Sequence, residues 1–275
     1  MKQIIKIWID IAKSDLSSSK ILYKNEKYRN SYFLFQQASE KANKAYALLN
    51  KTLSEKELSK VQHDQTKIYR KSVIEQQKSI VETVELIDNF KIPSFPKTYD
   101  EIIANYNTSL KKSISYIDSL RNCDLVNISY KELDENLNLL KELRNFKIIL
   151  PENFKDLMKS KITELINWIS QFNTENAKQT ETEFRNLLNN NKESEEFFNI
   201  MTDKILPLMY EVTYVSYTLF TCAILTIQHS SLTRYPSDGI DPENIYVKEL
   251  PIINKQMEFI FLLEECLTKI EKWNT

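Results

Sequence analysis

The chain contains two histidines, and one of them, His229, lies close to an arginine. Arg234 follows it after four intervening residues, at the expected end of a buried helix. An imidazole can accept a proton from a ribose 2′-OH, and a guanidinium can stabilise charge on a phosphate. Because this chemistry depends on geometry rather than on order along the chain, the pair is a candidate catalytic site. In the alternative, which we favour, His229 is a hydrogen-bonded group at a helix end and Arg234 pairs with Asp238 or Asp241.

The other histidine, His63, begins a second polar cluster that includes Asp64, Lys67 and Arg70. We expect all four residues on one long helix, where they would contact phosphate or supply a second catalytic imidazole. Charged residues make up 27% of the chain. A solvent-exposed helix face therefore produces the same cluster without function, and we favour that interpretation.

A third polar group lies on the second expected helix. Gln37 and Lys44 are candidate binding residues there, and Glu40 stands four residues before Lys44. An i,i+4 ion pair on a helix surface explains Glu40 and Lys44 without function. If they face inward instead, they form a buried hydrogen-bonded network or line a cleft. Asp15 is placed to pair with Lys44 or with Arg234.

We expect neither a metal site nor a cofactor. The sequence contains no His-x-x-x-His, Glu-x-x-His or Cys-x-x-Cys spacing, and its three cysteines are far apart (Cys123, Cys222 and Cys266). The only glycine is Gly239, so neither a dinucleotide-binding G-x-G-x-x-G nor a phosphate-binding G-K-[ST] motif can be written.

Composition favours a soluble protein of the cytoplasm. The 37 basic and 38 acidic residues give a net charge of −1, which creates no overall field for nucleic acid or an anionic membrane. Widely spaced cysteines indicate a reducing compartment. The first twenty residues lack the apolar core of a signal peptide. The apolar stretch 212–227 is shorter than the roughly 20 residues of a membrane span, so we expect a helix buried on all sides.

The scarcity of glycine and the three- and four-residue spacing of apolar side chains predict an all-α, up-and-down helical bundle. The expected helices are 2–23, 28–51, 54–90, 98–120, 129–146, 151–172, 194–232 and 251–273, with a weak helix in a mobile connection at 173–192. Pro207 should start or kink a helix. Three capping boxes mark helix starts: Ser54 with Glu57, Thr98 with Glu101, and Ser129 with Glu132.

Four segments together resemble one family. The first two expected helices carry Trp8-x-x-x-Ala12-x-x-Asp15-Leu16, then Gln36-Gln37-Ala38-x-Glu40-Lys41-x-x-Lys44-Ala45. His63-Asp64-x-x-x-Ile68 and Arg234-Tyr235-Pro236 follow later. These segments are similar to HEPN domains (higher eukaryotes and prokaryotes nucleotide-binding). The resemblance implies a HEPN-like bundle built from residues 1–90 and 206–275, with 91–205 as a helical insertion. Tyr235, within the last of these segments, and Asp238, close to it in the chain, are further candidate binding residues.

The resemblance implies RNA cleavage, toxin–antitoxin pairing with nucleotidyltransferase-like partners, phage defence, or non-catalytic binding, and usually a homodimer. Ribonuclease members carry R-x4–6-H, which is absent here because no arginine stands four to six residues before either histidine. We therefore expect a binding or regulatory module that engages a partner protein, nucleotide or RNA. The alternative is a divergent metal-independent endoribonuclease that uses His229 and Arg234, with His63 as a further candidate.

Overall fold

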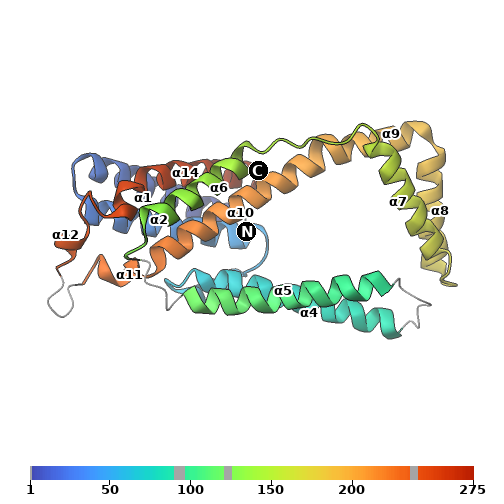
Figure 1. The fold of residues 1–275 in the computed structure, drawn as a ribbon, viewed down its shortest axis with the longest axis horizontal. Helices are drawn as coiled ribbons and strands as arrows, with labels where there is room; N and C mark the ends of the chain where they lie inside the picture. The colour runs from blue at the N-terminus through green and yellow to red at the C-terminus, as the bar shows by residue number, and fades with distance from the viewer. Residues whose placement is uncertain (1, 90–96, 121–125, 236–240) are drawn as a thin grey trace. The chain divides into compact units, whose positions relative to one another are not determined.

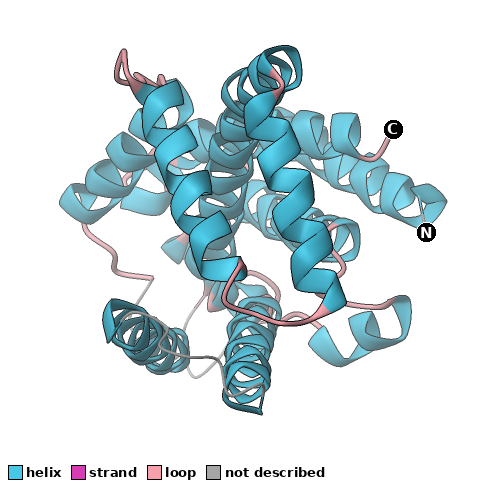
Figure 2. Cartoon of the chain, turned by 90° about the vertical axis from the view of Figure 1, so that its right-hand side faces the viewer, coloured by secondary structure: helices cyan, strands magenta, loops and turns pink. Residues whose placement is uncertain are grey.

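The computed structural model describes residues 2–89, 97–120, 126–235 and 241–275, with side chains apart from those of 83–89, 97–102 and 230. Within these ranges every regular element is a helix and none is a strand (Figure 2). The expected all-α helical bundle is therefore confirmed. The chain forms two compact units, residues 1–80, 104–144 and 214–275, and residues 81–103 and 145–213. Each is described by itself.

The first unit is built on a hairpin of two long helices, α1 (Lys2–Lys24) and α2 (Tyr28–Leu49), with α14 (Gln256–Trp273) packed against both (Figure 1). Helix α1 forms because Ile5, Ile9, Ala12 and Leu16 fall on one face, which is fully buried while the opposite face is solvated. The expected bounds of both helices are met to within two residues.

Helix α2 is the centre of this unit and is buried on nearly every side. Its buried residues include Tyr32, Phe35 and Ala38, and also four polar residues with amide or charged ends, namely Gln36, Glu40, Asn43 and Lys44. Each of those polar groups needs a partner, because an unpaired polar group inside a protein is costly. The neighbours of α2 therefore have to supply hydrogen bonds as well as apolar contacts.

The remaining helices of the first unit surround this hairpin. They are α3 (Glu55–Val61), α6 (Tyr130–Asn145), α11 (His229–Leu232), α12 (Pro242–Ile245), α13 (Pro251–Asn254), and parts of α4 (Thr66–Asn89), α5 (Lys97–Ser119) and α10 (Leu206–Ile227). Helices α4 and α5 pair side by side, where Arg70 Nε donates to Asp118 at 3.0 Å (Figure 1).

Two of the three expected capping boxes are present. The Ser54 N–H donates to Glu57 at 2.9 Å, and the Ser129 N–H donates to Glu132 at 2.9 Å. The side chains of the third, Thr98 and Glu101, lie outside the described residues.

The expected long helix from Ser54 to residue 90 is interrupted, and this prediction was wrong. Helix α3 ends at Val61 because Gln62 takes φ 53° and ψ −123°, which no helix can accommodate. Helix α4 restarts after Asp64, whose carboxylate accepts from the Thr66 N–H at 3.1 Å. His63 therefore lies in a turn rather than on a helix.

The second unit contains α7 (Phe154–Ile169), α8 (Glu175–Asn189), α9 (Asn191–Ile200) and a π-helical turn, η2 (Met201–Ile205). Its core is small and consists of Ile162, Ile166 and Phe198 with partly buried neighbours. The weak helix expected at 173–192 is the regular helix α8, because the Thr174 hydroxyl caps its first turn. Pro151 lies before α7 and not at its first position, since the helix begins at Phe154.

Pro207 lies at the start of α10, directly after η2, so it ends one helix and begins the next as its missing N–H requires. By length and composition alone, the helical stretch Asn191–Ile227 is able to cross a membrane. Its part from Tyr214 onward carries nine buried residues, as a core helix of the first unit does.

The two compact units divide the chain differently from the expected bundle (1–90 with 206–275) and insertion (91–205). Residues 104–144 belong to the first unit, because Leu133, Leu137 and Leu140 on α6 enter its core. Which residues make up the HEPN-like bundle proper stays a prediction.

The conformation of the turn that separates α3 from α4 can be tested by substituting Gln62. A side chain with a Cβ is strained at φ 53° and ψ −123°, whereas glycine adopts this conformation freely. We expect Gln62→Gly to raise the free energy of unfolding by about 1 kcal/mol in urea titrations. Gln62→Ala, which keeps the Cβ, should stay within about 0.5 kcal/mol of the original chain. A glycine variant less stable than the alanine variant would contradict the turn.

Candidate functional site

The polar face of α2 forms a buried charged pair. The Lys44 ammonium donates to Glu40 Oε1 at 2.6 Å, and the two residues are 8% and 5% exposed. The same ammonium lies 5.3 Å from the centre of the Trp8 ring on α1, a cation–π contact. Of the two arrangements that the spacing left open, the inward-facing network is the one observed.

His63 completes this group from the turn between α3 and α4. Its Nδ1 lies 2.9 Å from Glu40 Oε2, while the side chain is 54% exposed. Gln36 Nε2 also donates to that carboxylate oxygen, at 3.4 Å. A neutral imidazole that donates Nδ1–H to a carboxylate keeps Nε2 as an acceptor. The arrangement therefore holds the ring by one nitrogen and leaves the ring open to solvent. We call Glu40, Lys44 and His63 the α2 polar site.

Glu40 is ionised at neutral pH in this setting. Burial alone would raise the pKa of its carboxyl group, but the hydrogen bonds and charges of Lys44 and His63 outweigh that effect and lower it. The carboxylate thus accepts from both neighbours at once. It therefore holds the Lys44 ammonium and the His63 imidazole close together.

A second pair lies beside the α2 polar site. Lys41 Nζ is 2.8 Å from the Asp15 carboxylate on α1 and donates to Gln37 Oε1 at 3.0 Å. Asp15 therefore pairs with Lys41. The prediction that it pairs with Lys44 or Arg234 was wrong. Gln37 lies next to the site and is partly exposed.

The hydrogen-bond network under the site fixes the turn that carries His63. Gln65 is fully buried, and its side-chain oxygen accepts from Ser39 at 3.1 Å and from Asn43 at 2.8 Å. The Tyr69 hydroxyl donates to Asn43 in turn. Because Gln65 and Tyr69, which both follow His63, are bonded to α2, the core restrains the position of His63.

His229 has a different environment. It is fully buried; its Nδ1 lies 2.6 Å from the Tyr246 hydroxyl, and its ring centre is 4.7 Å from that of Tyr32. Burial also raises the pKa of Tyr246, which keeps that hydroxyl protonated. Among the described residues, two tyrosine rings thus pack against a His229 imidazole that is not exposed to solvent.

Arg234 lies after α11, and its guanidinium carbon is 5.8 Å from the Phe33 ring centre and 5.6 Å from that of Tyr235. Tyr235 is 63% exposed. Asp241, one expected partner, caps α12 by accepting from the Glu243 N–H at 2.9 Å. Asp238, the other expected partner, lies outside the described residues.

The basic residues expected near His63 are engaged within the protein. Lys67 donates to the Lys60 carbonyl at 3.3 Å, and Arg70 is bonded to Asp118. Asp64 serves as the cap of α4. In the part of the chain that the structure describes, no group of three or more His, Cys, Asp or Glu side chains is placed to hold a metal ion.

The partnership of Glu40 and His63 is what sequence reasoning missed. Twenty-three positions separate them, so no local spacing indicates the contact. The only signal was indirect, since both residues belong to the segments that carry the family resemblance.

Comparison with known proteins gives one match. The family model described as the HEPN domain matches residues 5–201. This span contains every residue of the α2 polar site and ends before α10. None of the curated proteins and none of the solved structures compared with the chain matches it.

We expect the α2 polar site to contribute measurably to stability. Glu40→Gln removes the carboxylate and leaves the Lys44 ammonium buried without its counter-charge, which we expect to lower the free energy of unfolding by about 3 kcal/mol. Glu135→Gln is the matched control. Its partner Lys131 is also four residues away, but both side chains are exposed, and we expect a change below about 0.5 kcal/mol.

The pH dependence of that difference follows from the lowered pKa of Glu40. A carboxyl group whose pKa is lower in the folded state stabilises the fold above its unfolded value and loses this effect as the pH falls through the folded value. The stability gap between the original chain and Glu40→Gln should therefore be full at pH 7 and narrow below about pH 4.5. A gap that stays constant down to pH 3 in urea titrations would contradict the ionised pair.

Proposed function

The chain belongs to the HEPN domain family, and on that basis we propose that it is a helical binding or regulatory module that engages RNA, a nucleotide or a partner protein without cleaving RNA. The family assignment gives the coarse function, a helical module related to nucleotides or RNA. The proposal adds that the engagement is non-catalytic.

The observation that carries this proposal is the burial of His229. A general base must come within hydrogen-bond reach of the proton that it removes. His229 is 0% exposed and packs between Tyr32 and Tyr246. The absence of R-x4–6-H from the sequence supports the same conclusion.

The cellular setting that we propose is a toxin–antitoxin or phage-defence system in the cytoplasm. Within it, the partner would be a nucleotidyltransferase-like protein or RNA, and the chain would act as a homodimer. These assignments rest on the family alone, and family membership by itself does not determine function.

A second candidate function is a metal-independent endoribonuclease. The sequence pattern assigned this activity to His229 and Arg234. The α2 polar site supports the activity better than that pair does. Glu40 orients the His63 ring through Nδ1 and leaves the ring 54% exposed, as a general base requires. Lys44 is next to the same carboxylate. Among the described residues of this site, however, we identify no second exposed group that would stabilise the charge on a phosphate.

One assay distinguishes non-catalytic binding from RNA cleavage. A fluorescently labelled single-stranded RNA is incubated with a molar excess of the protein in EDTA, and both cleavage and fluorescence anisotropy are followed. We expect intact RNA with the original chain and with His63→Ala, His229→Phe and Arg234→Ala, each first shown to be folded by circular dichroism.

Cleavage by the original chain that is lost in His63→Ala, but kept in Arg234→Ala, would replace the binding module with a ribonuclease at the α2 polar site. Cleavage that is lost in both His229→Phe and Arg234→Ala would instead restore the pair that the sequence pattern assigned. Cleavage that persists in all variants would indicate a contaminating nuclease, and a preparation purified free of it should leave the RNA intact.

A further inference from the structure

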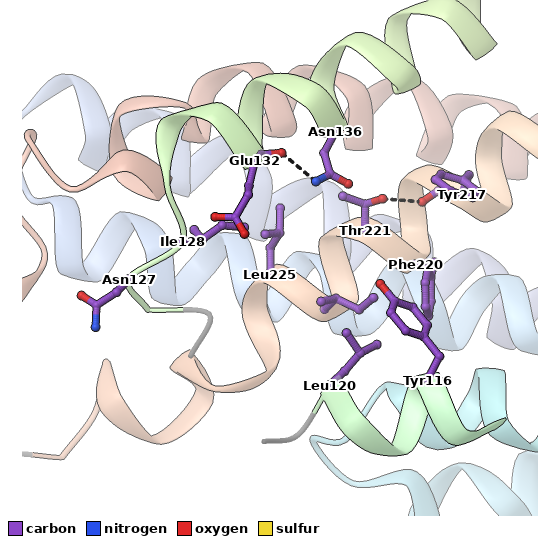
Figure 3. Close-up of a pocket in the computed structure, with 11 residues that line it drawn as sticks. Tyr116, Leu120, Asn127, Ile128, Glu132, Asn136, Tyr217, Phe220, Thr221 and Leu225 are labelled. Carbon is purple, nitrogen blue, oxygen red and sulfur yellow. Dashed lines mark hydrogen bonds between the residues drawn. The ribbon is translucent and has the colours of Figure 1, made fainter. Parts of the chain in front are cut away.

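A cavity of about 600 Å³ opens in the first unit, away from the α2 polar site (Figure 3). It lies where the end of α5, the residues before α6, the first turns of α6 and the second half of α10 meet. The residues that line it are Tyr116, Leu120, Asn127, Ile128, Glu132, Asn136, Tyr217, Phe220, Thr221, Ile224 and Leu225. Its volume is in the range of small-molecule sites, roughly 300–1,000 Å³.

One side of the cavity is aromatic. Tyr116 from α5 and Phe220 from α10 both line it (Figure 3). The Phe220 ring is held edge-on by Tyr69, with ring centres 4.7 Å apart, so its position is fixed by packing. Tyr116 is 56% exposed and Tyr217 is 43% exposed, so both rings are open to solvent beside the cavity. Exposed rings around a cavity favour a flat, ring-containing ligand.

Three polar side chains in the cavity, those of Glu132, Asn136 and Thr221, offer acceptor oxygens. Asn136 Nδ2 donates to the Glu132 carbonyl at 2.7 Å, and the Thr221 hydroxyl donates to the Tyr217 carbonyl at 2.9 Å. Both side chains therefore use a donor within the protein and keep an oxygen for a ligand. The Glu132 carboxylate is an acceptor only. A ligand that donates N–H or O–H hydrogen bonds would satisfy these three oxygens.

The charged side chain among the described residues that line the cavity is acidic. Hydrogen bonds from the Ser129 hydroxyl and N–H lower the pKa of Glu132, so it is ionised at neutral pH. Among the described residues that line the cavity, Glu132 is the one with a charged side chain, and none is Lys or Arg. A phosphate would meet repulsion here, whereas a cation would be attracted.

We propose that this cavity is a binding site for a planar aromatic cation that carries N–H donors, such as a protonated aminoacridine or an aryl amidine, and that it binds anionic ligands of similar size more weakly. The site is separate from the α2 polar site and does not depend on the function proposed for the chain. Rings on one side and acceptors with a carboxylate on the other match the two halves of such a molecule.

The test uses proflavine, a planar diaminoacridine cation, titrated into the full chain freed of nucleic acid and followed by fluorescence and calorimetry. We expect saturable one-to-one binding, with 1-anilinonaphthalene-8-sulfonate, an anion of similar size, at least tenfold weaker. Glu132→Gln should weaken proflavine binding by about five- to tenfold, the effect of one partly screened charge. Glutamine also completes a capping box, so α6 should keep its start.

Two further variants separate the cavity from the surface. Ile224→Trp places an indole in the cavity and should abolish saturable binding, with folding verified by circular dichroism. Glu135→Gln removes a charge from the same helix outside the cavity lining and should leave the dissociation constant unchanged.

Absence of saturable proflavine binding would overturn the proposal. So would equal affinity for the anion, or binding that neither Glu132→Gln nor Ile224→Trp weakens.

Discussion

The structure depends on one constraint: α2 is buried on nearly every side and yet carries charged and amide side chains. Helices that hold a bundle together are usually apolar where they are buried, because every buried polar group must find a partner. Here Glu40, Asn43 and Lys44 find theirs on three different elements, namely α1, the turn before α4, and α10. Polar pairing therefore selects which neighbours α2 can have, and apolar packing by α1 and α14 supplies the bulk of the stability.

The same constraint places the exposed histidine. His63 follows a residue with positive φ and precedes a buried glutamine that is bonded to α2, so the turn has little freedom. Glu40 then needs a second partner besides Lys44, and the imidazole provides it. The imidazole that pairs with Glu40 for a structural reason is thus also a side chain that is 54% exposed. Structural and functional interpretations of this site are therefore not alternatives. The pairing explains why the ring is held, and the exposure determines what it can reach.

Much of the fold could be predicted from the sequence, and the failures have physical causes. The spacing of apolar residues located α1 and α2 almost to the residue, and the boxes at Ser54 and Ser129 marked real helix starts. The break at Gln62 was missed because a glutamine with positive φ leaves no sign in the sequence, as a glycine would. The regular helix α8 was underestimated, since its hydrophobic stripe is sparse and the Thr174 cap decides its start. His229 could be identified as a candidate but not as a buried residue, because the rings that enclose it come from residues 32 and 246.

The distribution of charge determines which ligands the first unit is suited to recognise. Binding to nucleic acid through its backbone requires cations that can exchange counterions for phosphates. Three cations of α2 and α4 already have carboxylate partners, Lys41 with Asp15, Lys44 with Glu40 and Arg70 with Asp118, whereas Lys67 donates to the Lys60 carbonyl. A phosphate would have to compete with each of them, in a chain whose net charge is −1. Non-specific electrostatic attraction is therefore weak here. An RNA or nucleotide ligand would therefore have to be recognised through its bases or its shape. A protein partner does not depend on phosphate contacts. For either kind of ligand, the exposed imidazole and the exposed aromatic side chains are the groups best suited to make contact.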